Sequence, residues 1–102
     1  MQDKNFSEKD LDRYVNKFQD NLKNMVEIFQ KKNKAYNGAF FKVDNIQEAF
    51  EDVKRKYIRA KSVIDAKGDV KEIQDSLLDL ANYAVMVNIY IGDINDKSKK
   101  EV

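Results

Sequence analysis

Apolar residues recur along this chain at alternating steps of four and three, which is the spacing of one face of an α-helix. Three separate stretches follow this pattern, and we expect helices over residues 7–34, 44–65 and 69–91. The first apolar stripe consists of Leu11, Val15, Phe18, Leu22, Met25 and Phe29. The second consists of Ile46, Phe50, Val53, Tyr57, Ala60 and Ile64, and the third of Val70, Ile73, Leu77, Leu80, Ala84, Val87 and Ile91.

Polar residues at the start of each stretch support these boundaries. Each stretch opens with an acceptor side chain and a partner three residues later, which is the spacing of a capping box. The pairs are Ser7 with Asp10, Asp44 with Gln47, and Asp69 with Glu72. Glycines at positions 38, 68 and 92 follow the three stretches, where glycine adopts the left-handed conformation that ends many helices.

The fold class that follows is all-α, with three long helices in an antiparallel bundle. A chain of 102 residues is expected to form one domain, which we assign to residues 1–92. Residues 93–102 are polar and rich in lysine, and we expect them to form a disordered tail.

The third helix carries more apolar surface than one stripe needs. Its second apolar face consists of Leu78, Val85, Met86, Ile89 and Tyr90. A helix that is apolar nearly all round must be surrounded by other elements. We expect a homo-oligomer to complete the bundle, most simply a two-fold dimer, because such dimers are the commonest assemblies. The alternative is a monomer whose long first helix covers this face.

Composition then narrows the classes of function. The chain has neither cysteine nor histidine, so disulfides, thiolate sites and the commonest general base and zinc ligand are excluded. Its formal net charge is only +1, which argues against general nucleic-acid binding. We find no apolar run long enough to span a bilayer and no signal peptide, and therefore expect a cytoplasmic protein that does not contact membranes.

The stretch 75–86 is strongly apolar, yet it contains Asp79 and Asn82. A carboxylate and an amide inside a packed helix cost several kcal/mol unless something pairs with them. These two residues share a helix face with Asp75 and Tyr83. The third helix is therefore predicted both to build the core and to line a polar site.

Two further segments supply candidate ligand contacts, namely the basic face of the second helix and the turn before it. The candidate binding residues are Lys34, Tyr36, Asn37, Lys56, Arg59, Asp79, Asn82 and Tyr83. Lys and Arg suit phosphate oxygens, Asp and Asn pair with base or ribose edges, and aromatic rings stack on bases. If the segments converge, they form a nucleotide site. The alternatives are ion pairs between helices, a solvated basic face, packed aromatic rings and a simple Asn-Gly turn.

Three motifs occur in a recognisable order: KNKAYNGAF at 32–40, RKYIRAKSVI at 55–64 and LLDLANYAVM at 77–86. Together they resemble the nucleotide modification associated domain 1 family, small proteins common in bacteriophages and their hosts. The resemblance spans roughly residues 16–92. It implies an all-helical fold related to the MazG-type nucleoside triphosphate pyrophosphohydrolases, a link to nucleotide metabolism, and the host cytoplasm as location for a phage protein. The family's motifs fall on Lys56, Arg59 and Lys61 and on Asp75, Asp79, Asn82 and Tyr83.

An enzyme of the MazG type holds Mg²⁺ with acidic groups of two helices, in an E-E-x-x-E pattern followed by E-x-x-D. The candidate ligands here are Glu48, Glu51, Asp52, Glu72, Asp75 and Asp79. The second half of the pattern matches by letter, whereas the first half is permuted and followed at once by basic residues. We therefore expect no cofactor, and Mg²⁺ only if the protein is an enzyme.

Three functions follow from these observations. The first is non-catalytic binding, in which the protein sequesters a nucleotide-derived phosphate ligand, such as a host immune signalling nucleotide, as a molecular sponge. The second is a Mg²⁺-dependent nucleoside triphosphate pyrophosphohydrolase or a related nucleotide-processing enzyme. The third is a helical protein-interaction module. Cations and aromatic rings are better provided than metal ligands, which favours the first function.

Overall fold

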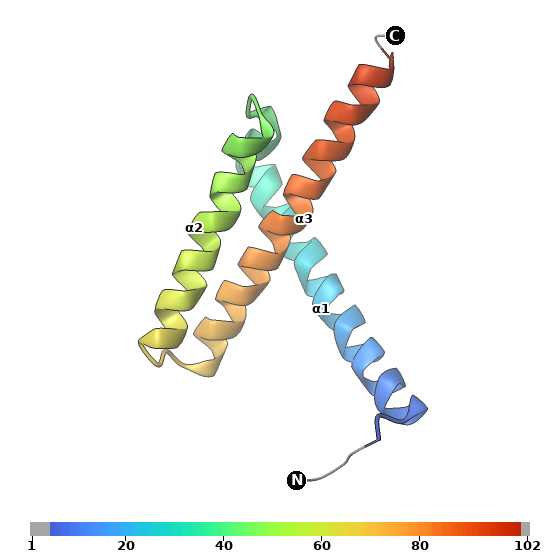
Figure 1. Cartoon of the computed structure of the whole chain (residues 1–102). Coiled ribbons are helices and arrows are strands. Elements are labelled where there is room, and N and C mark those ends of the chain that lie inside the picture. Colours follow the sequence, from blue (N-terminus) through green and yellow to red (C-terminus); the bar gives the residue numbers. More distant parts are fainter. Residues whose placement is uncertain (1–4, 101–102) are drawn as a thin grey trace.

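The computed structural model describes residues 5–100, with the surroundings of side chains up to residue 97, and this region of the chain is all-α. Helix α1 spans Glu8–Ala35, the short 3-10 helix η1 spans Ala39–Lys42, α2 spans Ile46–Asp65 and α3 spans Val70–Lys100. The predicted all-α fold with three long helices is confirmed. α2 packs antiparallel along α3, α1 crosses α3, and the N-terminal half of α1 projects away from the other helices (Figure 1).

The capping box predicted at the start of α1 is present in full. The Asp10 N–H donates to Ser7 Oγ at 3.0 Å, and the Ser7 N–H donates back to the Asp10 carboxylate at 3.2 Å. At the start of α3, the Glu72 N–H donates to Asp69 Oδ1 at 2.8 Å. These three bonds satisfy backbone N–H groups that have no partner within the helix.

The cap predicted at the start of α2 is wrong by one residue. Asn45, not Asp44, is the cap, and its Oδ1 accepts the Glu48 N–H at 2.8 Å. The Glu48 carboxylate accepts the Asp44 N–H at 3.3 Å, so Gln47 does not contribute to the box. Two adjacent residues are both good caps, and each has an acceptor three residues later, so the sequence pattern fits either register.

The two connections lie where the glycines predict them. Asn37 and Gly38 end α1 with positive φ angles of 53° and 64°. At the end of α2, the left-handed residue is Lys67, with φ of 55°, and Gly68 follows it. A Cβ atom at Gly68 would lie 2.7 Å from Val63 Cγ1, so this close approach of backbone to side chain requires glycine.

The third predicted boundary is wrong, because α3 does not end near Gly92 but continues to Lys100. Residues 93–100 are therefore helical rather than a disordered tail, and the last two residues of that predicted tail lie outside the described residues. Glycine inside a helix costs about 1 kcal/mol and does not by itself end it. No proline follows Gly92, so nothing in the sequence stops the helix there.

The core lies between α2 and α3. Ala49 and Val87 are buried, and Tyr90 beside them donates its hydroxyl hydrogen to the Val43 carbonyl oxygen at 2.7 Å. The residues of η1, Phe40 and Phe41, pack against this cluster. Small alanines at the contact let the two helix backbones approach closely, which fixes α2 against α3.

The apolar stripes are present, but the structure buries them unevenly. On α2 the buried residues are Ala49, Ala60 and Val63, whereas Phe50 and Tyr57 of the predicted stripe are more than half exposed. Every residue of α1 from 11 to 24 is exposed, so the first predicted stripe lacks cover over much of its length. The second face of α3 is divided in the same way, since Met86 and Tyr90 are buried and Val85 and Ile89 are exposed.

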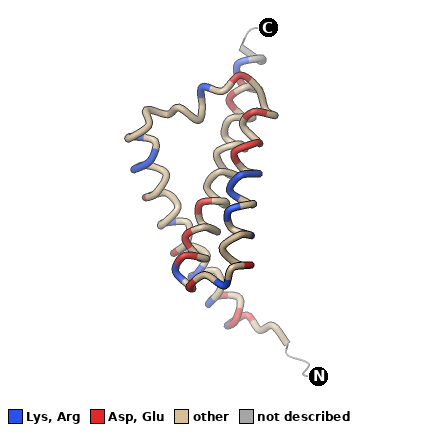
Figure 2. The backbone as a smooth tube through the Cα atoms, turned by 90° about the vertical axis from the view of Figure 1, so that its left-hand side faces the viewer, with Lys and Arg blue, Asp and Glu red and all other residues tan. Residues whose placement is uncertain are grey.

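The described residues show a mixed distribution of charge and one long apolar helix. Acidic and basic residues are interspersed along the helices in Figure 2. Contrary to the expectation from sequence, residues 70–97 of α3 are long and apolar enough, by length and composition, to cross a membrane. One such helix is weak evidence, because the core helix of a soluble protein meets the same criterion.

Candidate functional site

Asp79 of α3 is the point at which all three long helices meet. Its Oδ1 lies 2.9 Å from Lys32 Nζ of α1, and its Oδ2 lies 3.0 Å from Lys56 Nζ of α2. The Asp79 side chain is only 23% exposed, so water screens these two ion pairs less than pairs on an open surface. The double pair ties α1 and α2 to α3.

These contacts shift the pKa values of Asp79 and Lys32. Burial alone would raise the pKa of Asp79, but the hydrogen bonds from Lys32 and Lys56 outweigh burial and hold it below its ordinary value. The hydrogen bond to Asp79 raises the pKa of Lys32, although burial acts against this. Asp79 is therefore ionised at neutral pH and weakly basic.

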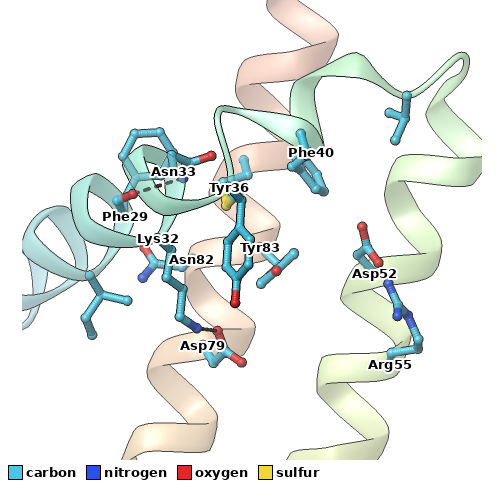
Figure 3. A pocket seen from close by; sticks show the side chains of 14 residues that line it. Phe29, Lys32, Asn33, Tyr36, Phe40, Asp52, Arg55, Asp79, Asn82 and Tyr83 are labelled. Carbon is cyan, nitrogen blue, oxygen red and sulfur yellow. Dashed lines mark hydrogen bonds and ion pairs between the residues drawn. The ribbon is translucent and has the colours of Figure 1, made fainter.

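A cleft of about 360 Å³ opens beside this ion pair, and its lining includes the aromatic side chains of Phe29, Tyr36, Phe40 and Tyr83. Phe40 of η1 meets the Tyr83 ring edge-on at 5.6 Å, and Lys56 Nζ lies 4.9 Å from the centroid of the same ring. Tyr36, at the end of α1, lines the cleft and is 70% exposed (Figure 3). We call this cavity the aromatic cleft. It offers ring faces next to cations, an arrangement typical of sites for planar ligands.

Asn82 also lines the aromatic cleft and is only 7% exposed. Its Nδ2 atom is buried and has no hydrogen-bond partner among the described residues. Such a group costs about 1–3 kcal/mol, and the great majority of buried polar side-chain atoms in proteins are paired. The contrast with Asn33 is direct, because Asn33 Nδ2 donates to the Phe29 carbonyl oxygen at 3.0 Å.

A second cleft, of about 610 Å³, lies on the other side of Asp79. We call it the charged cleft, because Lys32, Lys56 and Arg59 line it together with Glu72, Asp75 and Asp79. The two clefts share Lys32 and Asp79, so an extended ligand in one cleft can reach the other past this ion pair.

The structure brings together six of the eight predicted binding residues. Tyr36, Asp79, Asn82 and Tyr83 line the aromatic cleft, and Lys56 and Arg59 line the charged cleft with Asp79. Lys34 and Asn37 line neither cleft; both are exposed, and Asn37 serves the turn with its positive φ. The sequence-based alternative of an ion pair at Asp79 was also correct, so this residue has a structural partner as well as access to a cleft.

At the end of α1, the lysine that lines the clefts is Lys32 and not the predicted Lys34. Lys32 reaches Asp79, whereas Lys34 lines neither cleft. The signal was present in the spacing: Phe29, Lys32 and Tyr36 follow one another at three and four residues and all line the aromatic cleft. Lys34 lies half a turn away from this face.

Of the acidic residues considered as Mg²⁺ ligands, Glu72, Asp75 and Asp79 line the charged cleft, but they are not close enough together to share a metal ion. Asp79 pairs with two lysines, Asp52 contacts Arg55 one turn along α2, and Asp75 lies 3.4 Å from Lys71. Glu48 serves the cap of α2, and Glu51 and Glu72 are exposed. Within the described residues, no three acidic side chains lie close enough together to hold a metal ion.

Comparison with known proteins adds no relative: no family model, no curated protein and no solved structure matches this chain. The resemblance carried by the three motifs stays a prediction.

Proposed function

We propose that this protein binds a nucleotide-type ligand across the two clefts and holds it without turnover. The base lies in the aromatic cleft, against Tyr36 and Tyr83, and the phosphate lies beside Lys56 and Arg59. The observation that carries the proposal is the buried Asn82 Nδ2 without a partner among the described residues. A ligand acceptor atom that accepts from Nδ2 removes a penalty of about 1–3 kcal/mol.

The cations remain available although Asp79 pairs with two of them. An ammonium group has three N–H donors, and Lys32 and Lys56 each direct one at Asp79. The Lys32 side chain is 46% exposed, so a ligand can reach its ammonium group from solvent. Arg59 lines the charged cleft and is exposed. A phosphate group can therefore bind these cations while Asp79 stays in place.

Holding the ligand fits the state of Asp79 better than hydrolysing it. A general base works best when its pKa lies near the working pH. The two lysines lower the pKa of Asp79, which makes it a poor proton acceptor. In the phage setting that the family resemblance implies, a protein that only holds its ligand would act as a sponge for a nucleotide-derived signal.

The test uses the full chain and begins with denaturation of purified protein and mass spectrometry of any released small molecule. Titration calorimetry with mono-, di-, tri- and cyclic nucleotides, with and without Mg²⁺, then measures affinity and turnover. We expect stoichiometric binding of an unchanged nucleotide. Turnover that stops when Mg²⁺ is chelated would instead favour the Mg²⁺-dependent enzyme. If the protein binds no nucleotide, the proposal is wrong and the protein-interaction module is the remaining function.

Asn82→Leu is the sharpest variant, because leucine keeps the shape of the side chain and removes the unpaired donor. We expect the variant to melt at a higher temperature than the parent and to bind its nucleotide about 5- to 150-fold more weakly. Asn88→Leu, at an exposed position of the same helix, is the control and should leave binding unchanged. Unaltered affinity of Asn82→Leu would show that the amide does not contact the ligand.

A further inference from the structure

The N-terminal half of α1 exposes an apolar stripe that no other described element covers. Leu11, Val15 and Leu22 are 53%, 43% and 43% exposed, and Phe18 between them is 66% exposed. In Figure 1 this half of the helix stands clear of α2 and α3. Soluble proteins rarely expose contiguous apolar surface of this kind unless it binds something.

The C-terminal half of α1 forms one wall of an apolar groove, and α3 forms the other. The groove has a volume of about 360 Å³ and is bordered by two polar residues, Gln30 and Asn82. Its apolar walls consist of Leu22, Met25, Val26, Phe29, Val85 and Ile89. Val26, Val85 and Ile89 are each exposed by between 43% and 54%. A groove of this type accepts the apolar face of a helix.

We propose that a second copy of this chain fills the groove, with its α1 antiparallel to the first. The exposed half of α1 from each copy lies in the groove of the other, so the contact closes on itself with two-fold symmetry. The stripe pairs with itself in one register: Leu11 of one copy faces Phe29 of the other, Val15 faces Met25, and Phe18 faces Leu22.

The charges along α1 select the antiparallel orientation. The first turn has a net negative charge, with Glu8 and Asp10 on either side of Lys9. The last turn is basic, with Lys34 and with Lys32, which also pairs with Asp79. The register brings the first turn of one copy beside the last turn of the other, where opposite charges attract. A parallel arrangement would set acidic ends together and basic ends together.

The surface available is also the right size for a stable dimer. The exposed apolar residues of the stripe and groove are Leu11, Val15, Phe18, Leu22, Val26, Val85 and Ile89. Tyr14, three residues after Leu11 and four before Phe18, adds to the same face and is 50% exposed. Side chains of this size, exposed to about half, supply roughly 700–800 Å² of apolar surface per copy. A standard stable interface buries about 800 Å² per partner.

Sedimentation equilibrium of the full chain tests the assembly. We expect a mass of about twice the 11.9 kDa chain, and a return to the chain mass in Phe18→Glu. Phe18 is exposed in the monomer, so this variant should keep its helical circular dichroism. Ile58→Glu, at a 54% exposed position of α2, is the matched control and should stay dimeric. A monomeric parent, or an assembly that Phe18→Glu leaves intact, would overturn the proposal.

Cross-linking tests the register, since the chain has no cysteine of its own. We expect a mixture of Val15→Cys and Met25→Cys chains to form a disulfide-linked pair on oxidation, whereas neither variant links to itself. Self-linking of Val15→Cys would show a parallel contact and refute the proposed arrangement. Nucleotide binding is measured separately, so the dimer can fail without the proposed function failing.

Discussion

At the scale of single residues, Asp79 combines a structural and a candidate functional role. Asp79→Asn removes the negative charge that pairs with Lys32 and Lys56. It should lower the free energy of unfolding by about 1–2 kcal/mol at neutral pH. Urea denaturation measures this change. Asp75→Asn is the control, because its contact with Lys71 spans 3.4 Å between exposed side chains and should contribute less than about 0.5 kcal/mol.

The same pair predicts a pH dependence with a defined sign. The pKa of Asp79 is lowered in the folded state, so its contribution is complete above the ordinary value of 3.8 and disappears as pH falls through the lower folded value. The pKa of Lys32 is raised, so its contribution is lost only as pH rises above its ordinary 10.5. The difference in stability between parent and Asp79→Asn should therefore shrink at both extremes and be constant around neutrality.

At the residue level, the sequence singles out polar side chains that lie in an apolar helix. Asp79 and Asn82 stand out because a carboxylate and an amide interrupt an apolar helix, and the structure gives both of them unusual surroundings. Lys32 and Lys34 both sit in a polar, basic helix end, so composition does not separate them. The two lysines differ only in their angular position around the helix. Which of these positions faces Asp79 depends on where α1 crosses α3.

At the scale of elements, two glycines in open surroundings should respond oppositely to the same substitution. Gly92 lies inside α3, and nothing stands within 4 Å of where its Cβ would be, so Gly92→Ala should increase helicity and stability by up to about 1 kcal/mol. Gly38 is equally open but has φ of +64°, so Gly38→Ala should cost about 1–2 kcal/mol. Circular dichroism and thermal melts measure both. A loss of stability in Gly92→Ala would instead support a helix end at this glycine.

Helix existence was predictable and helix ends were less so, for reasons visible in particular residues. Each helix is long enough for its period to be unmistakable, and the Ser7 box has one possible register. Asp44 and Asn45 compete for one cap, and only the structure shows which residue takes it. Gly92 carries the sequence signal of a helix end, but no proline follows it and a single glycine does not end a helix, so α3 continues.

At the scale of the whole molecule, the sequence predicted how much apolar surface exists but not which faces a single chain covers. α2 carries two neighbouring apolar faces, and the alanine-rich one packs on α3 while Phe50 and Tyr57 stay more than half exposed. The angle between α1 and the segment that follows it, η1, places the N-terminal half of α1 beyond the core (Figure 1). This angle is set by the turn at Asn37 and Gly38 and by packing, not by the periodicity of the helix.

The consequence of this shape is that stability should depend on protein concentration. The apolar surface that a monomer leaves exposed on α1 and in the groove is buried when two copies associate. Folding and dimer formation are therefore linked by mass action. Each tenfold rise in concentration adds about 1.4 kcal/mol per dimer, which corresponds to about 3–6 °C in the melting temperature. Calorimetric melts over a range of concentrations measure this slope. In Phe18→Glu the slope should vanish, because its monomer unfolds at a temperature that is independent of concentration.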